Sequence, residues 1–396
     1  MKNILIIILC LLTWQSVNGQ DTIRNFIFGH SLLDHRPPAI PTPSDETTVP
    51  HWLHLLSVEA GKYFAGTGQY GFLPQHDNLP PIAQWGYDIV PPVWESDTED
   101  FDEVDFNSVL ITAGNFMQWQ GPDEDYPGEP EGTNPLSSTI SIVDWLENNS
   151  DSMKIIIYEN WPDMAGYMES FPPSDTEFAN YNAYTTGEFH DWWIEYHDSL
   201  IAQRPLAQVK LVPVGPIIAE LLSTAPYSEI DRTEIYEDDA PHGRASLYFL
   251  ASVITYMAIT EMPAPSSFQV PDIVHETIAD NYIDIVNYAW NYLTDFNDDQ
   301  GNSRVFLTDN VINGHALLAE NNIQLFPNPT SGIFHIKGAT SDYVIEVLNS
   351  MAAVYQTYDA TEDLIINIEE LPSGMYFVKM TNKINGQLFV KTLIKE

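Results

Sequence analysis

The sequence predicts an α/β protein: a three-layer αβα sandwich around a central parallel sheet, followed by a small C-terminal β-sandwich. Three observations support this prediction. Apolar runs of strand length alternate with amphipathic segments of helix length as far as about residue 295. Polar residues follow several of these runs, at the strand ends where open α/β sheets place their chemistry. From residue 323 onward the pattern changes to short alternating strands with regular turn residues.

The chain begins with a segment typical of a secretory signal peptide. Lys2 precedes an apolar run over residues 4–12, and the small residues Val17 and Gly19 fit a cleavage site after Gly19. The run is short for a membrane-spanning helix, so we expect cleavage and no transmembrane segment in the mature protein; the alternative is an uncleaved anchor. The single cysteine, Cys10, lies in this leader, which excludes a cysteine nucleophile and a zinc–thiolate site after cleavage.

The composition limits the partners of the protein. With 396 residues the chain is long enough for two domains, and with 44% hydrophobic residues it can bury a large core. Its 15 basic and 56 acidic residues give a net charge of −41, so we expect no nucleic-acid partner, because phosphates would be repelled. The acidity favours solubility, including in a salty medium where self-repulsion is screened.

The predicted first strand delivers a hydroxyl group to the carboxyl end of the sheet. Its apolar residues end at Gly29, and Ser31 follows two residues later. A second strand leads to residues 112–115 (TAGN), and residues 239–242 (DAPH) stand just before a predicted helix. We expect strands at residues 22–28, 106–113, 153–158 and 209–214, and helices at residues 49–62, 137–148, 175–203, 243–259 and 272–293.

Two other segments have loop character. Residues 61–71 contain four glycines, which indicates a backbone turn or an approach loop. Residues 74–105 form a long segment rich in proline, tryptophan and acidic residues, without periodicity, which is typical of a functional loop or a lid.

The three motifs in this order resemble those of SGNH (GDSL-type) hydrolases, whose domain would cover residues 20–295. The resemblance implies a flavodoxin-like sheet and a serine hydrolase in which Ser31 is the nucleophile, His242 the base, and Asp239 the group that orients the imidazole. Asp238 is a rival orienter, which we set aside because its spacing gives the wrong reach. The motif departs from the family pattern at His30, where the family has aspartate.

Further site residues are predicted around this triad. The oxyanion would be held by the backbone N–H of Ser31, by the Asn115 side chain and by a glycine N–H; Gly68 and Gly71 both qualify, and we favour Gly68. Taken singly, each residue also has a structural explanation. Asn115 could cap a turn, for example, and Asp239 could be the N-cap of the following helix.

Flat aromatic side chains suit sugar rings and apolar acyl groups. We therefore assign Trp119 and Trp161 to substrate binding, while helix tryptophans fit the core. His30 is a third substrate-binding candidate, although a packed or solvated histidine is its alternative. We predict no metal site, because His51 and His54 share a helix face without a carboxylate at matching spacing.

The C-terminal residues resemble a sorting domain of the type IX secretion system. The motifs that carry this resemblance are residues 326–332 (FPNPTSG) and 371–379 (LPSGMYFVK), and the domain would cover residues 323–396 after a linker at 296–322. The resemblance implies the type IX machinery as a partner and a secreted or cell-surface protein. A carbohydrate-binding sandwich is the alternative, since the architecture alone does not fix function.

Together these features predict a secreted serine esterase that needs no cofactor. We expect an acylated carbohydrate or another ester as substrate, with removal of acetyl groups from a polysaccharide as the first choice. The alternatives are an esterase or lipase for lipids or small acyl esters, and a surface glycan-binding protein whose triad has decayed.

Overall fold

A computed structural model describes residues 22–35, 48–112, 120–150 and 153–307, and most of 324–395, where 338–342, 350–353, 362 and 384–387 are left out. The expected signal peptide lies outside the described residues. Among the helices that the structure describes, none combines the length and the apolar character needed to span a bilayer.

The centre of the larger part is a five-stranded sheet in the order β2-β1-β3-β4-β5, in which every neighbouring pair is parallel. β3 and β4 are buried at every position, as expected for strands covered on both faces. The predicted α/β architecture with a central parallel sheet is therefore confirmed. The strands are β1 (Thr22–Gly29), β2 (Tyr63–Tyr70), β3 (Ser108–Thr112), β4 (Lys154–Tyr158) and β5 (Val209–Val212).

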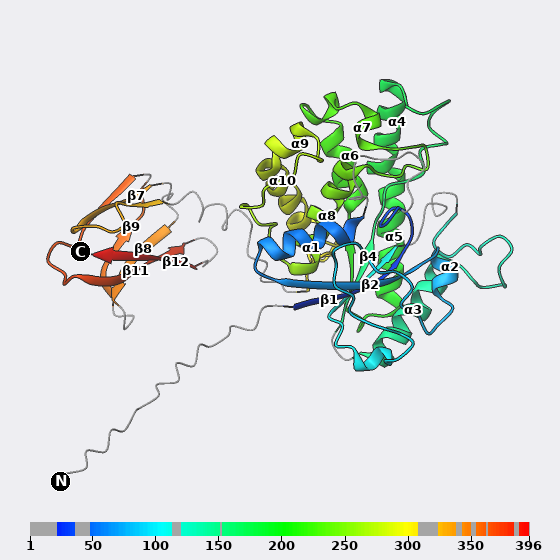
Figure 1. Cartoon of the computed structure of the whole chain (residues 1–396), viewed down its shortest axis with the longest axis horizontal. Helices are drawn as coiled ribbons and strands as arrows, with labels where there is room; N and C mark the ends of the chain where they lie inside the picture. The colour runs from blue at the N-terminus through cyan, green and yellow to red at the C-terminus, as the bar shows by residue number, and fades with distance from the viewer. Residues whose placement is uncertain are drawn as a thin grey trace, which may run out of the picture.

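Helices cover both faces of this sheet (Figure 1). Alternate strand residues point to opposite faces, so Ile23 and Ile27 join one apolar cluster with α1, α6, α8 and α10, whereas Phe26 and Phe28 join a second cluster with α3 and α5. The helices are α1 (Val49–Glu59), α2 (Leu73–His76), α3 (Pro135–Asn149), α4 (Asp175–Thr186), α5 (Glu188–Gln203), α6 (Val214–Leu222), α7 (Arg232–Ile235), α8 (Ala245–Thr260), α9 (Glu276–Asp280) and α10 (Tyr282–Asp295).

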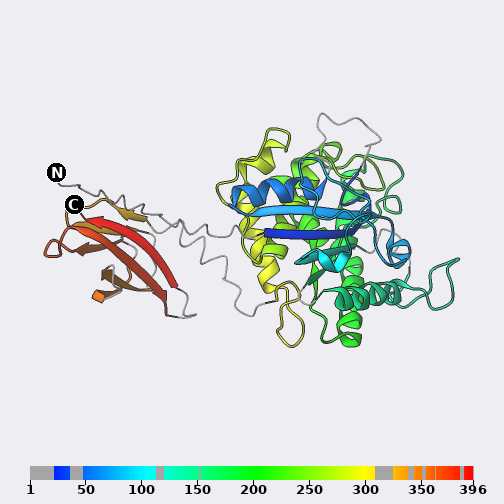
Figure 2. The same ribbon diagram turned by 60° about the horizontal axis from the view of Figure 1, so that its bottom comes forward.

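The glycine-rich segment that we predicted as a turn is the edge strand β2, which lies beside β1 (Figure 2). The prediction was wrong because Gly68 serves close packing within a strand and not a turn. A Cβ on Gly68 would lie 2.7 Å from the Ile27 carbonyl oxygen and 2.2 Å from the Tyr87 hydroxyl oxygen, so only glycine fits there.

The long loop after α2 runs along the open edge of β2 and is tied to it by backbone hydrogen bonds. Gly68 donates to the carbonyl of Trp85 and accepts from its N–H, and Gly66 donates to the carbonyl of Pro91. Trp94 and Phe101 of this loop are buried in the second apolar cluster. The loop therefore protects a sheet edge, and it holds Trp85 beside the carboxyl ends of the strands.

The expected single helix at residues 175–203 is two helices, α4 and α5, separated at Gly187. The backbone there is not helical, with φ −111° and ψ −112°, and the N–H of Gly187 closes the last turn of α4 onto the carbonyl of Tyr184. The expected helix at 272–293 is likewise divided into α9 and α10.

Residues 296–307, which the sequence assigns to the linker, pack on the α/β core. Val305 and Phe306 are buried in the first apolar cluster, and the Arg304 carbonyl accepts from the N–H of Leu211 in β5. This segment thus continues the sheet domain beyond α10.

The C-terminal part is antiparallel and has its own apolar cluster, which shares no residue with the other two. Two small sheets, in the orders β10-β7-β6 and β12-β11-β8-β9, form the expected sandwich-like unit. Their strands are β6 (Gln324–Phe326), β7 (Ile333–Lys337), β8 (Tyr343–Asn349), β9 (Val354–Asp359), β10 (Asp363–Asn367), β11 (Gly374–Asn382) and β12 (Leu388–Lys395).

Candidate active site

Ser31 stands on a tight turn at the carboxyl end of β1. The N–H groups of Leu33 and Asp34 both donate to the carbonyl of His30, at 2.9 and 3.3 Å, so the chain leaves the strand in a single helical turn. A Cβ on Gly29 would lie 2.9 Å from a Leu33 methyl group, which explains the glycine before this turn. The Tyr248 hydroxyl donates to the Ser31 carbonyl at 2.7 Å and fixes the backbone of the serine.

His242 reaches Ser31 from the loop between α7 and α8. This loop closes on itself, since the N–H of Glu237 donates to the His242 carbonyl at 2.7 Å. The His242 Nε2 atom lies 2.9 Å from the Ser31 Oγ atom. The structure thus brings together two residues that are 211 positions apart in the sequence.

The carboxylate beside His242 belongs to Asp238 and not to Asp239, the residue that we predicted. Asp238 Oδ2 lies 2.7 Å from His242 Nδ1, and Asp238 Oδ1 accepts from the backbone N–H groups of Ala240 and His242. Asp239 is exposed, and its carbonyl accepts from the N–H of Met164. The prediction failed because the loop turns back at Asp238, which puts the carboxylate four residues before the imidazole within reach.

This arrangement determines which imidazole nitrogen carries the proton. Partial burial alone would raise the pKa of Asp238, but the hydrogen bonds from the His242 ring and backbone and from Ala240 outweigh it and lower the pKa below its ordinary value. The ionised carboxylate accepts the Nδ1–H of His242 and leaves a lone pair on Nε2. The Ser31 hydroxyl can then donate to that lone pair, which is the arrangement a general base needs.

Neither candidate glycine can hold an oxyanion in this structure. The N–H of Gly68 donates to the Trp85 carbonyl at 3.1 Å, and the N–H of Gly71 donates to the Gly29 carbonyl at 2.9 Å. Both N–H groups already donate hydrogen bonds within the sheet or to the loop along its edge, which corrects the prediction of Gly68.

Two other oxyanion donors were predicted. Asn115 lies outside the described residues. The Ser31 N–H has no acceptor among the described residues and stays a candidate donor.

His30 is fully buried and does not face a substrate, so the structure contradicts its assignment to substrate binding and agrees with the alternative of a packed histidine. Its Nδ1 accepts from the N–H of Leu32 at 3.3 Å, so its Nε2–H donates to the Thr112 hydroxyl at 2.8 Å. Burial, with further contributions from His76 and His242, lowers the pKa of His30 to about 3. His30 is therefore a neutral structural link between β1 and β3.

Trp161 is also buried, at 1% exposure, and its indole N–H donates to the carbonyl of Pro241 at 2.9 Å. Its role in this structure is to brace the loop that carries His242, and it does not line the cleft as predicted. Trp119, the other tryptophan assigned to the substrate, lies outside the described residues.

An open cavity of about 500 Å³ lies in front of the serine and the imidazole. Its other wall is formed by Gln84 and Trp85 of the long loop after α2 and by Tyr70 of β2. The ring centroids of Tyr70 and Trp85 are 5.0 Å apart. The Oε1 atom of Gln84 accepts from the N–H of Tyr70, so its amide NH₂ is left without a partner among the described residues. The sequence indicated a functional loop here but could not show which of its residues faces Ser31.

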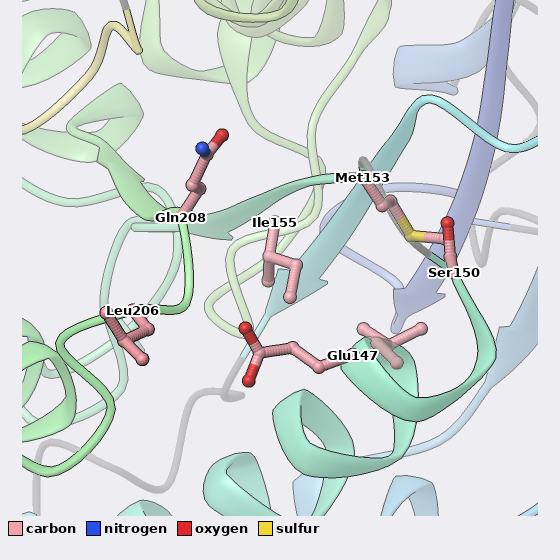
Figure 3. Close-up of a pocket in the computed structure, with 7 residues that line it drawn as sticks. Glu147, Ser150, Met153, Ile155, Leu206 and Gln208 are labelled. Atoms are coloured by element: carbon pink, nitrogen blue, oxygen red, sulfur yellow. The ribbon is translucent and has the colours of Figure 1, made fainter.

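Another cavity lies away from these groups. This cavity of about 210 Å³, shown in Figure 3, lies at the amino ends of β4 and β5, opposite the sheet edge that carries Ser31. Its lining holds one carboxylate and no histidine, so it lacks a nucleophile–base pair. The lining residues are Leu146, Glu147, Ser150, Met153, Ile155, Leu206 and Gln208.

Comparison with protein families identifies the C-terminal part. Residues 324–396 match the family described as "Secretion system C-terminal sorting domain". This match confirms the predicted sorting domain and places the protein outside the cell or on its surface by way of the type IX system, whose machinery is a partner. A search of curated proteins found no match to the chain.

Solved structures share only a distant likeness with this chain. PorZ, a surface component of the type-IX secretion system of Porphyromonas gingivalis, is 11% identical over 20% of this chain and 12% of that chain, with a TM-score of 0.18. An endo-β-1,4-mannanase from Thermotoga petrophila is 11% identical over 74% of this chain and 93% of that one, with a TM-score of 0.17. These values are too low to support an argument about fold or activity.

Proposed function

We propose that the protein is a secreted serine esterase of SGNH type that removes acetyl groups from an extracellular polysaccharide. The observation that carries this proposal is the line of hydrogen bonds from Ser31 Oγ through the His242 ring to Asp238 at the carboxyl edge of a parallel sheet. A serine alone at a strand end would be weak support. A serine whose hydroxyl meets an imidazole that a carboxylate orients has the three groups that nucleophilic catalysis needs.

In the proposed reaction the Ser31 oxygen attacks the ester carbonyl carbon while His242 Nε2 takes the hydroxyl proton. The C–O bond to the sugar then breaks, His242 returns the proton to the departing alcohol, and acetyl-Ser31 remains. A water molecule attacks this intermediate, giving its proton to His242, and acetate leaves as the proton returns to Ser31. Asp238 stays ionised throughout and stabilises the imidazolium.

The developing oxyanion needs donors near the serine. The Ser31 N–H is one, and the Asn115 carboxamide stays a predicted second. The Gln84 carboxamide is a further candidate, because its Oε1 is fixed by Tyr70 and its NH₂ borders the same cavity. Loss of one such donor typically lowers kcat about 10²- to 10³-fold.

Three features favour a neutral acylated glycan as the substrate. The sorting domain directs the protein out of the cell, where polysaccharides are found. The cleft is open and presents the aromatic pair Tyr70 and Trp85, which suits a sugar ring. The net charge of −41 disfavours polyanionic chains.

The test measures acetate release from a panel of acetylated polysaccharides, with Ser31→Ala as the control. We expect release by the wild type and none by the variant. Acyl-chain preference beyond about six carbons on nitrophenyl esters would instead favour a lipid esterase. Well-folded wild type that a fluorophosphonate probe does not label would point to a glycan-binding protein without catalysis.

A further inference from the structure

A second imidazole lies directly against the proposed general base. His35, four residues after Ser31, belongs to the end of the same turn and borders the same cavity. Its ring stacks on the ring of His242, with 3.6 Å between the centroids and 10° between the planes. Its side chain is 12% exposed, so this stacked pair is largely shielded from water.

A carboxylate also lies beside the His35 ring, as one does beside the His242 ring. His35 Nδ1 lies 3.1 Å from Glu237 Oε2, and the side chain of Glu237 is fully buried. Glu237 directly precedes Asp238, which holds Nδ1 of His242 at 2.7 Å. Two consecutive carboxylates therefore lie beside two parallel imidazoles, and the second pair has no task in the reaction described above.

The charge state of His35 matters because His242 becomes an imidazolium during the reaction. Burial, and then the nearby His242, lower the pKa of His35; Glu237 and Asp238 oppose this shift but do not reverse it. A neutral ring face is a favourable neighbour for an imidazolium, whereas a second cation at 3.6 Å would be repelled. Asp34, in the wall of the same cavity, is the remaining acidic neighbour on this turn.

We propose that His35, with Glu237 beside its ring, is a positioning residue for the triad: its ring is the surface on which His242 stays in line between Asp238 and Ser31 while it takes and returns the proton. This inference rests on the function proposed above. It implies that loss of the ring lowers kcat more than it changes KM, because His35 acts on the reacting groups and leaves most of the cleft unchanged. Displacement of reacting groups by about 1 Å can cost about 10² in rate.

The test compares His35→Ala with His35→Phe. Phenylalanine keeps a flat ring but cannot take up a proton. His54→Ala is the control, because His54 lies on α1 and faces the Phe64 carbonyl. The readouts are the rate at which a fluorophosphonate labels Ser31 and the pH dependence of kcat and kcat/KM on nitrophenyl acetate.

We expect His35→Ala to lower kcat and the labelling rate about 10- to 100-fold with KM within about twofold, and His35→Phe to stay within about threefold of wild type. We also expect a difference in the plot of log kcat/KM against pH on its acid side. The slope should steepen towards two in the wild type, because both His35 and His242 can take up a proton there. It should stay at one in His35→Phe, because phenylalanine cannot take up a proton.

Wild-type kinetics in a folded His35→Ala variant would overturn the inference and leave the proposed esterase intact. The same holds if His35→Phe loses as much activity as His35→Ala, or keeps the acid limb of the wild type. A wild-type protein that is neither labelled nor active on any ester would overturn both proposals.

Discussion

The Asp238 carboxylate accepts hydrogen bonds both from the His242 ring and from the backbone of the turn that carries it. One oxygen accepts from the His242 ring and the other accepts from two backbone N–H groups, so the side chain fixes both the loop and the imidazole tautomer. Asp238→Asn should lower kcat about 10³- to 10⁴-fold, since an amide can stabilise the wrong tautomer and cannot stabilise the imidazolium.

Asp239→Asn is the matched control for this change, because the exposed neighbour carries the same side chain. Its kcat should stay within about threefold of the wild type. Steady-state kinetics on nitrophenyl acetate would measure both variants. If Asp239→Asn lowered kcat more than Asp238→Asn does, Asp239 would be the residue that orients His242.

His30 should make the protein sensitive to acid. The folded protein keeps His30 neutral down to about pH 3, while the unfolded chain takes up the proton near pH 6.5. Acid therefore favours the unfolded state, and the free energy of unfolding falls as pH drops through 6.5 towards 3. Burial lowers the pKa values of His76 and His197 to about 4, which acts in the same direction.

His30→Asn tests this argument, because asparagine can accept from the Leu32 N–H but cannot be protonated in this range. Its melting temperature should fall less between pH 7 and pH 4.5 than that of the wild type, whatever its value at pH 7. Thermal unfolding at several pH values would measure the difference, and parallel curves would contradict the assignment.

At the scale of elements, the segment after β4 supports the loop that carries His242. The Trp161 side chain follows β4 and donates to Pro241, the residue before the base. Trp161→Phe keeps most of the buried ring and removes this hydrogen bond, so kcat should fall about tenfold while KM stays within about twofold.

Trp192→Phe is the control for this variant, since it removes a similar hydrogen bond, to Gln120, at a helix on the second sheet face. It should leave kcat near the wild-type value. If Trp161→Phe instead raised KM and left kcat unchanged, the result would support the substrate-binding role that we predicted for Trp161 from the sequence.

At the scale of the whole molecule, the two parts of the chain have separate apolar clusters, with no residue in common. A chain that ends at Leu307 keeps Val305 and Phe306 in the α/β core and removes the sorting domain. We expect this truncated chain to keep kcat and KM within about twofold of the full chain.

The same truncation should abolish export by a host that has the type IX system. Activity assays of the purified protein and fractionation of producing cells would measure the two effects. Loss of activity in a soluble truncated chain would show that the sorting domain supports the site.

Strong local patterns made several features predictable. The apolar run that ends at Gly29 located the first strand and Ser31, and alternation of strand and helix patterns gave the layered sheet. Strand β2 was missed because glycine is depleted in strands, and β2 contains Gly66 and Gly68. Only the close contact of Gly68 with Ile27 and Tyr87 explains a glycine at that position. Asp239 was preferred over Asp238 because the spacing in the chain does not reveal where a turn reverses.

The sequence by itself determined the alternating α/β pattern, the sorting domain, and the serine and histidine at the ends of their elements, because these depend on residue type and short-range periodicity. Only the tertiary structure decided which carboxylate meets His242, that both glycine N–H groups are occupied, and that His35 stacks on the base. Those outcomes depend on distances between segments far apart in the chain, and such distances are set by packing across the whole core.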